Sequence, residues 1–300
     1  MFGGMHVFHH WFDHFSGVGS GARTLEIIRR SPIRDERPWP LLFVHGAYTA
    51  AWCWDEYFLD YFASRGFDAT ALSLRGHGGS SGSESLHMHG ILDYVADLES
   101  VVADFERPPV LIGHSMGGFV VQKLLERLDL PGAVLMASVP PGGLATSVMR
   151  LFMTQPLLFG QISLMHWAGP GAVDLDTARR AVFSDALDRE RLREFAYRMQ
   201  GESQRAILDM TVFSMPSPAA LTGTPTLVMA AEDDALFSVN ENRYTANLND
   251  AEFVVIPDIA HAMMLEPHWE RAAAALADWL ERLPTSETDQ TVVDLPSDRR

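Results

Sequence analysis

Seven short apolar runs, five to seven residues each, constrain the fold of this 300-residue chain more than any other feature of its sequence. Segments with apolar residues three and four apart lie between or after these runs, at 55–66, 91–105, 117–128 and 268–283, and this spacing predicts helices. Strands that alternate with helices form a mostly parallel sheet with helices on both faces, which is an α/β fold. The predicted strands are TLEIIRR (24–30), LLFVH (41–45), DATALSL (68–74), PVLIG (109–113), GAVLMAS (132–138), PTLVMAA (225–231) and EFVVIP (252–257).

The alternation is interrupted once, between Pro140 and Thr224. This stretch contains no convincing strand and is dense in Met, Phe, Leu and Trp. A structureless loop of that length is improbable inside a compact domain. We therefore predict a helical cap at 140–222, inserted between the two core segments 23–139 and 223–283.

The two ends of the chain lie outside this pattern. Residues 1–22 begin MFGGMHVFHHWFDHF, in which His6, His10 and His14 would share one face of a helix and could in principle hold a metal ion. No carboxylate or cysteine is clearly placed to complete such a site. We therefore favour an aromatic lead-in without a metal, and we predict that the polar segment 284–300 is disordered.

The composition excludes several classes of partner. The formal net charge of −16 argues against nucleic acid and against anionic membrane surfaces. Cys53 is the only cysteine, so an intrachain disulfide is impossible. No apolar run approaches the roughly 18 residues of a membrane span, and the N-terminus lacks the basic and apolar regions of a signal peptide. We expect a cytoplasmic protein without a membrane span, and the sequence leaves its oligomeric state open.

The segment LIGHSMGGF (111–119) places a serine between glycines where a strand ends and a helix begins. Such a tight turn forces Ser115 into a strained backbone conformation and leaves room only for small residues at Gly113 and Gly117. This G-x-S-x-G arrangement exposes the serine hydroxyl and directs the Met116 N–H toward the group that the hydroxyl attacks. We interpret Ser115 as a nucleophile rather than as an ordinary turn residue.

A serine nucleophile needs a base, and a histidine base needs a carboxylate that fixes its tautomer. His261 follows the last predicted strand and is the candidate base. The strand at 225–231 is followed by three adjacent carboxylates at 232–234, and Asp234 is the one after which the chain turns inward at an apolar pair. Asp258 is a further candidate, although its place after a proline favours a turn.

Two backbone N–H groups complete the predicted site. Met116 supplies one of them. The strand at 41–45 ends at His45, and Gly46 lets the backbone bend so that the N–H of Ala47 faces the serine. We predict that the Ala47 and Met116 amides stabilise an oxyanion and that His45 has a structural role.

With these residues placed, the chain resembles the serine α/β-hydrolase superfamily over residues 24–283. The resemblance implies a Ser–Asp–His triad in that chain order. It places the acid at Asp234 and leaves Asp233 as the second candidate, because family members usually carry the acid before a small and an apolar residue. Ala262, where the hydroxynitrile lyases carry a lysine, speaks against cyanohydrin chemistry. His114 stands where the carbon–carbon bond hydrolases tend to carry asparagine, and VHGAYTAAWCW (44–54) is most similar to the esterase and methylesterase branch. The motifs that carry the resemblance are VHGA (44–47), RGHGGSSG (75–82), GHSMGG (113–118), AEDDAL (231–236) and IPDIAHAMMLEP (256–267).

The residues and the resemblance together predict a carboxylic ester hydrolase that forms an acyl-enzyme and needs no metal or organic cofactor. The Met and Phe content of the cap predicts an apolar pocket for small to medium ester substrates. A lactonase or another acyl-transfer hydrolase with the same triad is an alternative. A non-catalytic small-molecule receptor is an alternative of another class, which the intact triad disfavours. We expect the pocket to include Tyr48, His114, Phe152, Met153, Trp167 and Leu236.

Overall fold

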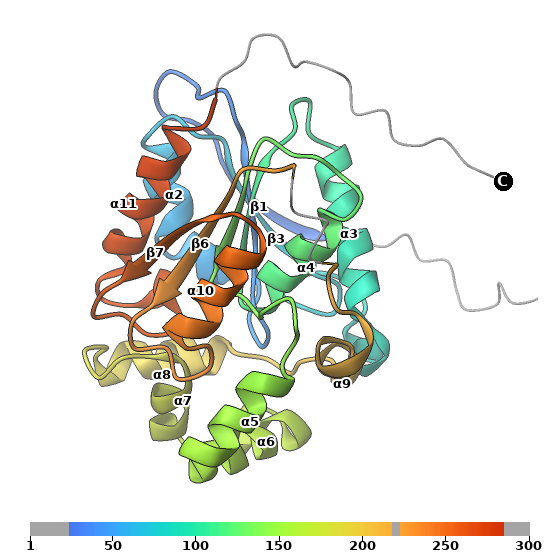
Figure 1. Ribbon diagram of the computed structural model, residues 1–300, viewed down its shortest axis with the longest axis vertical. Coiled ribbons are helices and arrows are strands. Elements are labelled where there is room, and N and C mark those ends of the chain that lie inside the picture. The colour runs from blue at the N-terminus through green and yellow to red at the C-terminus, as the bar shows by residue number, and fades with distance from the viewer. Residues whose placement is uncertain (1–23, 218–222, 285–300) are drawn as a thin grey trace, which may run out of the picture.

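The computed structural model describes residues 24–217 and 223–284, which contain one seven-stranded sheet flanked by helices (Figure 1). The strands are β1 (Glu26–Arg30), β2 (Leu41–Val44), β3 (Ala69–Ser73), β4 (Val110–His114), β5 (Ala133–Met136), β6 (Thr226–Ala231) and β7 (Glu252–Ile256). Their order across the sheet is β1-β3-β2-β4-β5-β6-β7, and only the β1–β3 pair is antiparallel. The predicted α/β class is therefore confirmed. The lead-in at 1–22, with the candidate ligands His6, His10 and His14, and nearly all of the tail at 284–300 lie outside the described residues.

Helices cover both faces of the sheet. The core helices are α1 (Trp52–Asp55), α2 (Phe58–Ala63), α3 (Ile91–Ala103), α4 (Met116–Leu124), α10 (Val239–Leu248) and α11 (Trp269–Leu280), with short turns of 3₁₀ helix at η1 (Ser83–Met88) and η5 (Met263–Leu265). In β2, Leu41 and Phe43 pack with α1, α2 and α11, whereas Leu42 and Val44 pack with residues of α3, α4 and α10. Figure 1 shows α2 and α11 on one side of the sheet and α3 and α4 on the other. Because both faces are covered, the central strands read as continuous apolar runs.

One predicted helix is shorter than expected. The pattern at 55–66 predicts a single helix, but α1 ends at Asp55 and α2 covers only Phe58–Ala63, with a break at Tyr57, whose φ of −146° and ψ of −42° are not helical. The Tyr57 ring stacks on Trp269 of α11, with ring centroids 5.0 Å apart. The break thus accompanies a contact with a helix far along the chain, which local periodicity does not report.

Helix α10 was not predicted. Its sequence, VNENRYTANL, contributes only Ala246 to the buried apolar core, so it lacks a clear apolar stripe. The helix begins instead with a capping box, in which Ser238 accepts from the Glu241 N–H and the Glu241 carboxylate accepts from the Ser238 N–H. That S-x-x-E pattern is the sequence signal that identifies this helix.

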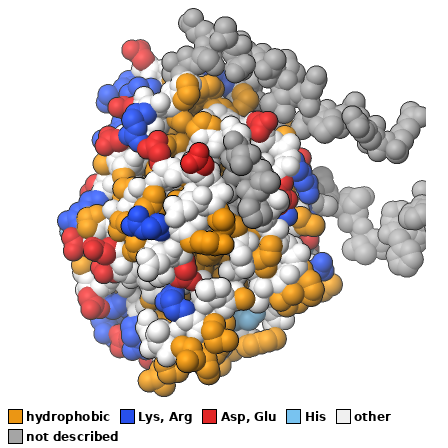
Figure 2. Space-filling view, viewed as in Figure 1, with side chains coloured by type: hydrophobic (Ala, Val, Ile, Leu, Met, Phe, Trp, Pro, Cys, Tyr) orange, Lys and Arg blue, Asp and Glu red, His pale blue; other side chains and the backbone are white. Residues whose placement is uncertain are grey.

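Every element between β5 and β6 is helical in the described residues. They are α5 (Ala145–Thr154), α6 (Pro156–Ala168), η2 (Pro170–Ala172), α7 (Leu175–Val182), α8 (Arg189–Arg198), α9 (Gln204–Leu208) and a π-helical turn, η3 (Asp209–Phe213). We call this insertion the cap. It lies at the end of the sheet where the strands finish, and Figure 2 shows apolar side chains gathered at its outer end. No helix in the described parts of the chain combines the length and the apolar character needed to cross a membrane.

Candidate active site

Ser115 occupies the turn between β4 and α4 with φ 52° and ψ −117°, a left-handed conformation that non-glycine residues rarely adopt. A Cβ atom at Gly113 would lie 2.5 Å from the Gly117 carbonyl oxygen, and a Cβ at Gly117 would lie 2.5 Å from the carbonyl oxygen of His45. Both positions therefore admit only glycine. The strained turn projects Ser115 into a cavity between the core and the cap.

His261 lies in the loop after β7 and pairs with Asp234 from the loop after β6. Its Nδ1 is 2.8 Å from Asp234 Oδ2, and both side chains are buried. The other carboxylate oxygen, Oδ1, accepts the N–H groups of Leu236 at 2.7 Å and Phe237 at 3.0 Å. Because a carboxylate accepts, Nδ1 carries a proton toward Asp234, and Nε2 is the ring nitrogen left to act as a general base.

The other carboxylates considered from sequence lie elsewhere. Asp233 is exposed to solvent. Asp258 has φ 52°, and its carboxylate pairs with Arg271 on the surface at 2.8 Å, as a turn residue would. Within the described residues, the carboxylate paired with His261 is that of Asp234.

His114 contacts His261, the candidate base. Its Nε2–H donates to the His261 carbonyl at 2.9 Å, and the two ring centroids are 4.7 Å apart. Burial, with the neighbouring His261 ring, lowers the His114 pKa well below its ordinary value, so the imidazole is neutral. His114 therefore holds the backbone of His261 without adding charge to the cavity.

The loop after β2 passes directly against Ser115. A Cβ atom at Gly46 would lie 3.0 Å from the Ser115 Cβ, so only glycine permits the approach. Within the described residues, the backbone N–H groups of Ala47 and Met116 donate no hydrogen bond to the protein. Ala47 lines the cavity, and Met116 is the first residue of α4. The predicted oxyanion donors are therefore free beside the serine.

His45 orients one of these donors. Its Nδ1–H donates to the Gly46 carbonyl at 2.8 Å, its Nε2 accepts the Leu74 N–H at 3.0 Å, and Thr49 Oγ1 also donates to the Gly46 carbonyl at 3.0 Å. The C=O and N–H of a trans peptide point in opposite directions, so the Ala47 N–H points away from His45. Burial, and the nearby His77, lower the His45 pKa to about 3, which keeps the ring neutral.

The cavity is apolar and is shared between the core and the cap. Among the described residues, no Asp, Glu, Lys or Arg lines it. Three of the predicted pocket residues, Tyr48, His114 and Leu236, are part of the lining. The remaining lining residues are Ala47, Thr49, Trp52, Cys53, Ser115, Ile162, Met165, Ala181, Val182, Phe183, Phe195, Met199, His261, Ala262, Met264 and Leu265.

The prediction was wrong for the other three pocket residues. Phe152, Met153 and Trp167 are 51%, 72% and 72% exposed and are not among the residues that line the cavity. Helix α6 is apolar on every side, so its sequence does not mark an inner face, and the residues that reach the cavity are Ile162 and Met165. Composition identified an apolar cap but could not orient its helices.

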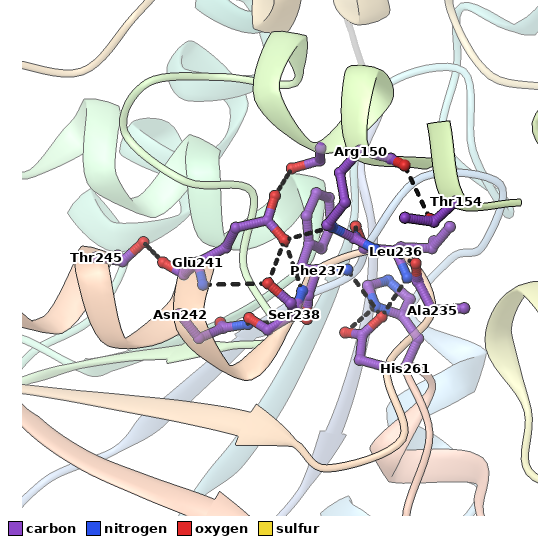
Figure 3. Close-up of polar contacts among 12 residues, drawn as sticks. Arg150, Thr154, Ala235, Leu236, Phe237, Ser238, Glu241, Asn242, Thr245 and His261 are labelled. Carbon is purple, nitrogen blue, oxygen red and sulfur yellow. Dashed lines mark hydrogen bonds and ion pairs between the residues drawn. The ribbon is translucent and has the colours of Figure 1, made fainter. Parts of the chain in front are cut away.

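Arg150 of α5 ties the cap to the loop that carries Asp234 (Figure 3). Its Nη2 donates to the carbonyls of Ala235 at 3.2 Å and Leu236 at 2.5 Å, and its Nε donates to Glu241 at 3.0 Å. This arginine was not singled out from the sequence. Its contacts stabilise the turn whose N–H groups hold the Asp234 carboxylate.

The described residues contain no group of three or more His, Cys, Asp or Glu side chains that could hold a metal ion. His6, His10 and His14 lie outside this part of the chain. The groups gathered around the cavity can remove a proton from a hydroxyl and stabilise an oxyanion. These are the requirements of acyl transfer.

A mostly parallel sheet with a strained serine between two glycines, and a His–Asp pair on later loops, is the arrangement typical of the α/β-hydrolase class. A sequence model of the Alpha/beta hydrolase family matches residues 41–279, and the chain belongs to this family. It is similar to a monoacylglycerol lipase from Mycolicibacterium smegmatis, with 24% identity over 73% of this chain and 80% of that protein. It is also similar to Methyl jasmonate esterase 1 from Vitis vinifera, with 32% identity over 36% of this chain and 42% of that protein.

The fold is also that of solved esterases. A thermophilic esterase from Thermogutta terrifontis superposes with a TM-score of 0.66 at 21% identity, covering 89% of this chain and 96% of that structure. The two proteins therefore share their fold over most of both chains.

Proposed function

We propose that this protein hydrolyses neutral, apolar carboxylic esters through an acyl-enzyme on Ser115. The observation that carries the proposal is the cavity lined by Ser115 and His261, whose Nδ1 is paired with Asp234. No Asp, Glu, Lys or Arg among the described residues lines this cavity. The similarity to a monoacylglycerol lipase and to a methyl jasmonate esterase supports an ester as substrate. An uncharged, apolar lining favours apolar acyl and alcohol groups over charged ones.

The residues have the following roles in this mechanism. His261 Nε2 takes the proton of Ser115 Oγ, which attacks the ester carbonyl carbon, and the N–H groups of Ala47 and Met116 bind the oxyanion. The protonated His261 then gives its proton to the departing alcohol. Water, deprotonated by His261, attacks the acyl-enzyme, and the acid leaves as Ser115 regains its proton. Asp234 stabilises the imidazolium in both steps.

Ser115→Ala tests the nucleophile. Wild-type protein should hydrolyse p-nitrophenyl esters of several acyl lengths and act poorly on the negatively charged p-nitrophenyl hemisuccinate. The variant should lose about 10⁴-fold or more in kcat, because only binding and the oxyanion donors remain. A fluorophosphonate probe should label the wild-type protein at Ser115 and leave the variant unlabelled.

Four outcomes would contradict the proposal. Labelling at another residue, or undiminished activity of Ser115→Ala, would remove Ser115 from the mechanism. Faster turnover in a parallel lactone panel would make the protein a lactonase. Tight ligand binding without turnover of any ester or lactone would favour a receptor.

A further inference from the structure

The cap holds the loop that carries the Ala47 amide. Tyr48, the next residue, has φ 65°, and all three of its polar groups contact the cap. Its N–H donates to Glu202 Oε2 at 3.4 Å, its carbonyl accepts the Gln200 N–H at 3.0 Å, and its hydroxyl lies 3.2 Å from Nδ1 of His166. A left-handed tyrosine is strained, and these contacts come from two separate cap segments.

Glu202 is the centre of this attachment. In addition to Tyr48, its carboxylate accepts from Tyr94 Oη at 2.9 Å, from the Ser203 N–H at 2.6 Å and from His77 Nε2 at 3.0 Å. The side chains of Glu202 and His77 are both 0% exposed. The carboxylate thus accepts from four donors, three of which belong to core residues, although Glu202 itself lies between the cap helices α8 and α9.

The pair is charged. His77 Nδ1 faces the Arg75 carbonyl at 3.1 Å while Nε2 faces Glu202, so both ring nitrogens meet oxygen acceptors and both carry protons. Burial alone would lower the His77 pKa, but the Glu202 carboxylate more than offsets it, and the pKa is raised. A buried ion pair seldom adds stability over an apolar replacement, so stability alone does not account for this one.

We propose that Glu202 is a positioning residue that sets the direction of the Ala47 N–H in the oxyanion hole. Three consecutive peptides in this loop are held. The Gly46 carbonyl is bound by His45 of the core, the Tyr48 N–H by Glu202 and the Tyr48 carbonyl by the backbone of Gln200. Along the chain, the Ala47 N–H lies between the Gly46 carbonyl, which the core binds, and the Tyr48 groups, which the cap binds. The direction of this N–H therefore depends on both sets of contacts. This inference rests on the proposed function.

Glu202→Gln tests the inference. The amide keeps the shape of the side chain but turns an NH₂ group toward two of the four donors, which weakens the hold on Tyr48. We expect kcat to fall by about 10- to 100-fold, less than the loss of an oxyanion donor itself, while KM changes by less than about threefold. Glu202→Asp keeps the charge but shortens the side chain, so it should also lower kcat. This second variant provides the test if the glutamine variant does not fold.

Asp209→Asn is the matched control. Asp209 is also a buried cap carboxylate, and its Oδ2 accepts the Ile91 N–H of core helix α3 at 3.0 Å. It neither lines the cavity nor touches the loop at 46–48. This variant should keep kcat within about twofold of wild type even where its melting temperature falls.

A trifluoromethyl ketone separates positioning from general destabilisation. Ser115 Oγ adds to the ketone carbon, the serine proton passes to His261, and the resulting oxyanion occupies the position of the reaction's oxyanion. The inhibition constant should rise in proportion to the fall in kcat/KM for Glu202→Gln and stay unchanged for Asp209→Asn. Substrate affinity, measured in a Ser115→Ala background, should be the same with and without Glu202→Gln.

The outcomes are distinguishable. If both Glu202 variants match Asp209→Asn in kcat and in the inhibition constant, Glu202 is structural only and the inference is wrong, while the proposed function stands. Absence of ester turnover in the wild-type protein would overturn the proposed function and this inference with it.

Discussion

Neighbouring carboxylates in the loop after β6 have different environments because the backbone turns between them. The Asp233 N–H donates to the Ile259 carbonyl at 3.0 Å, and its side chain faces solvent. The next side chain, Asp234, is buried against His261 and two backbone N–H groups. A carboxylate in water contributes little through its charge, whereas one that orients a base contributes to the reaction itself.

We therefore expect Asp234→Asn and Asp233→Asn to differ by orders of magnitude in kcat. The first keeps the geometry but favours the wrong imidazole tautomer, and should lower kcat by about 10³-fold or more. The second should change kcat by less than about twofold, because an exposed charge is worth at most about 1 kcal/mol. Steady-state kinetics of both variants with one ester decides the matter, and a reversed order would move the acid to Asp233.

At the scale of elements, the cap is joined to both sides of the cavity. Arg150 of α5 binds the loop after β6, which carries Asp234, while Glu202 binds the loop after β2, which carries Ala47. The cap therefore contacts the supports of the predicted base and of the predicted oxyanion donor. We expect changes at these contacts to alter catalysis as well as stability.

Arg150→Met should lower the free energy of unfolding by about 1 to 3 kcal/mol, the usual effect of losing hydrogen bonds to a charged group. It should also lower kcat by several-fold, because the turn that holds Asp234 loses its contact with α5. Arg180→Met is the control, since among the described residues the hydrogen bonds of Arg180 Nη2 go to two cap residues, Gln161 and Thr177. Denaturant unfolding and ester kinetics of both variants provide the comparison. Equal kcat values for the two would contradict a role for Arg150 at the acid loop.

At the scale of the whole molecule, buried neutral histidines make stability depend on pH. The pKa of His45 falls from an ordinary value of 6.5 to about 3 in the folded protein. Below pH 6.5, His45 of the unfolded chain therefore binds a proton, whereas His45 of the folded protein stays neutral down to about pH 3. Stability present above pH 6.5 is lost as the pH falls through this window, by up to about 1.4 kcal/mol per pH unit.

His45→Asn should reduce this dependence. The variant should be less stable than wild type at pH 7, because the Gly46 carbonyl and the Leu74 N–H lose their shared partner. Between pH 6.5 and pH 5 its free energy of unfolding should fall less steeply than that of wild type. Urea unfolding of wild type and variant at both pH values measures the two slopes. The contributions of the other titrating groups are the same in both proteins and largely cancel when the slopes are subtracted. Parallel slopes would show that His45 does not contribute.

The strands, most of the core helices and the strained serine were determined by the sequence itself, because each is a local property. Apolar runs flanked by glycine indicate strands that are buried on both faces. Gly113 and Gly117 indicate the close backbone approach that the turn at Ser115 requires. Local pattern was insufficient where a helix buries little apolar surface, as in α10, or where a distant helix interrupts one, as at Tyr57.

The tertiary structure alone decided which cap residues face the cavity and what holds the loops around it. Met199 faces the cavity and Phe152 faces solvent, although both belong to the same apolar insertion. Tyr48 and Glu202 are 154 residues apart, and nothing in the residues around either one indicates the other. Spacing along a chain encodes the period of a helix or strand. Contacts between distant segments depend instead on how the elements pack. The contacts that hold the loops of this candidate site are of this long-range kind.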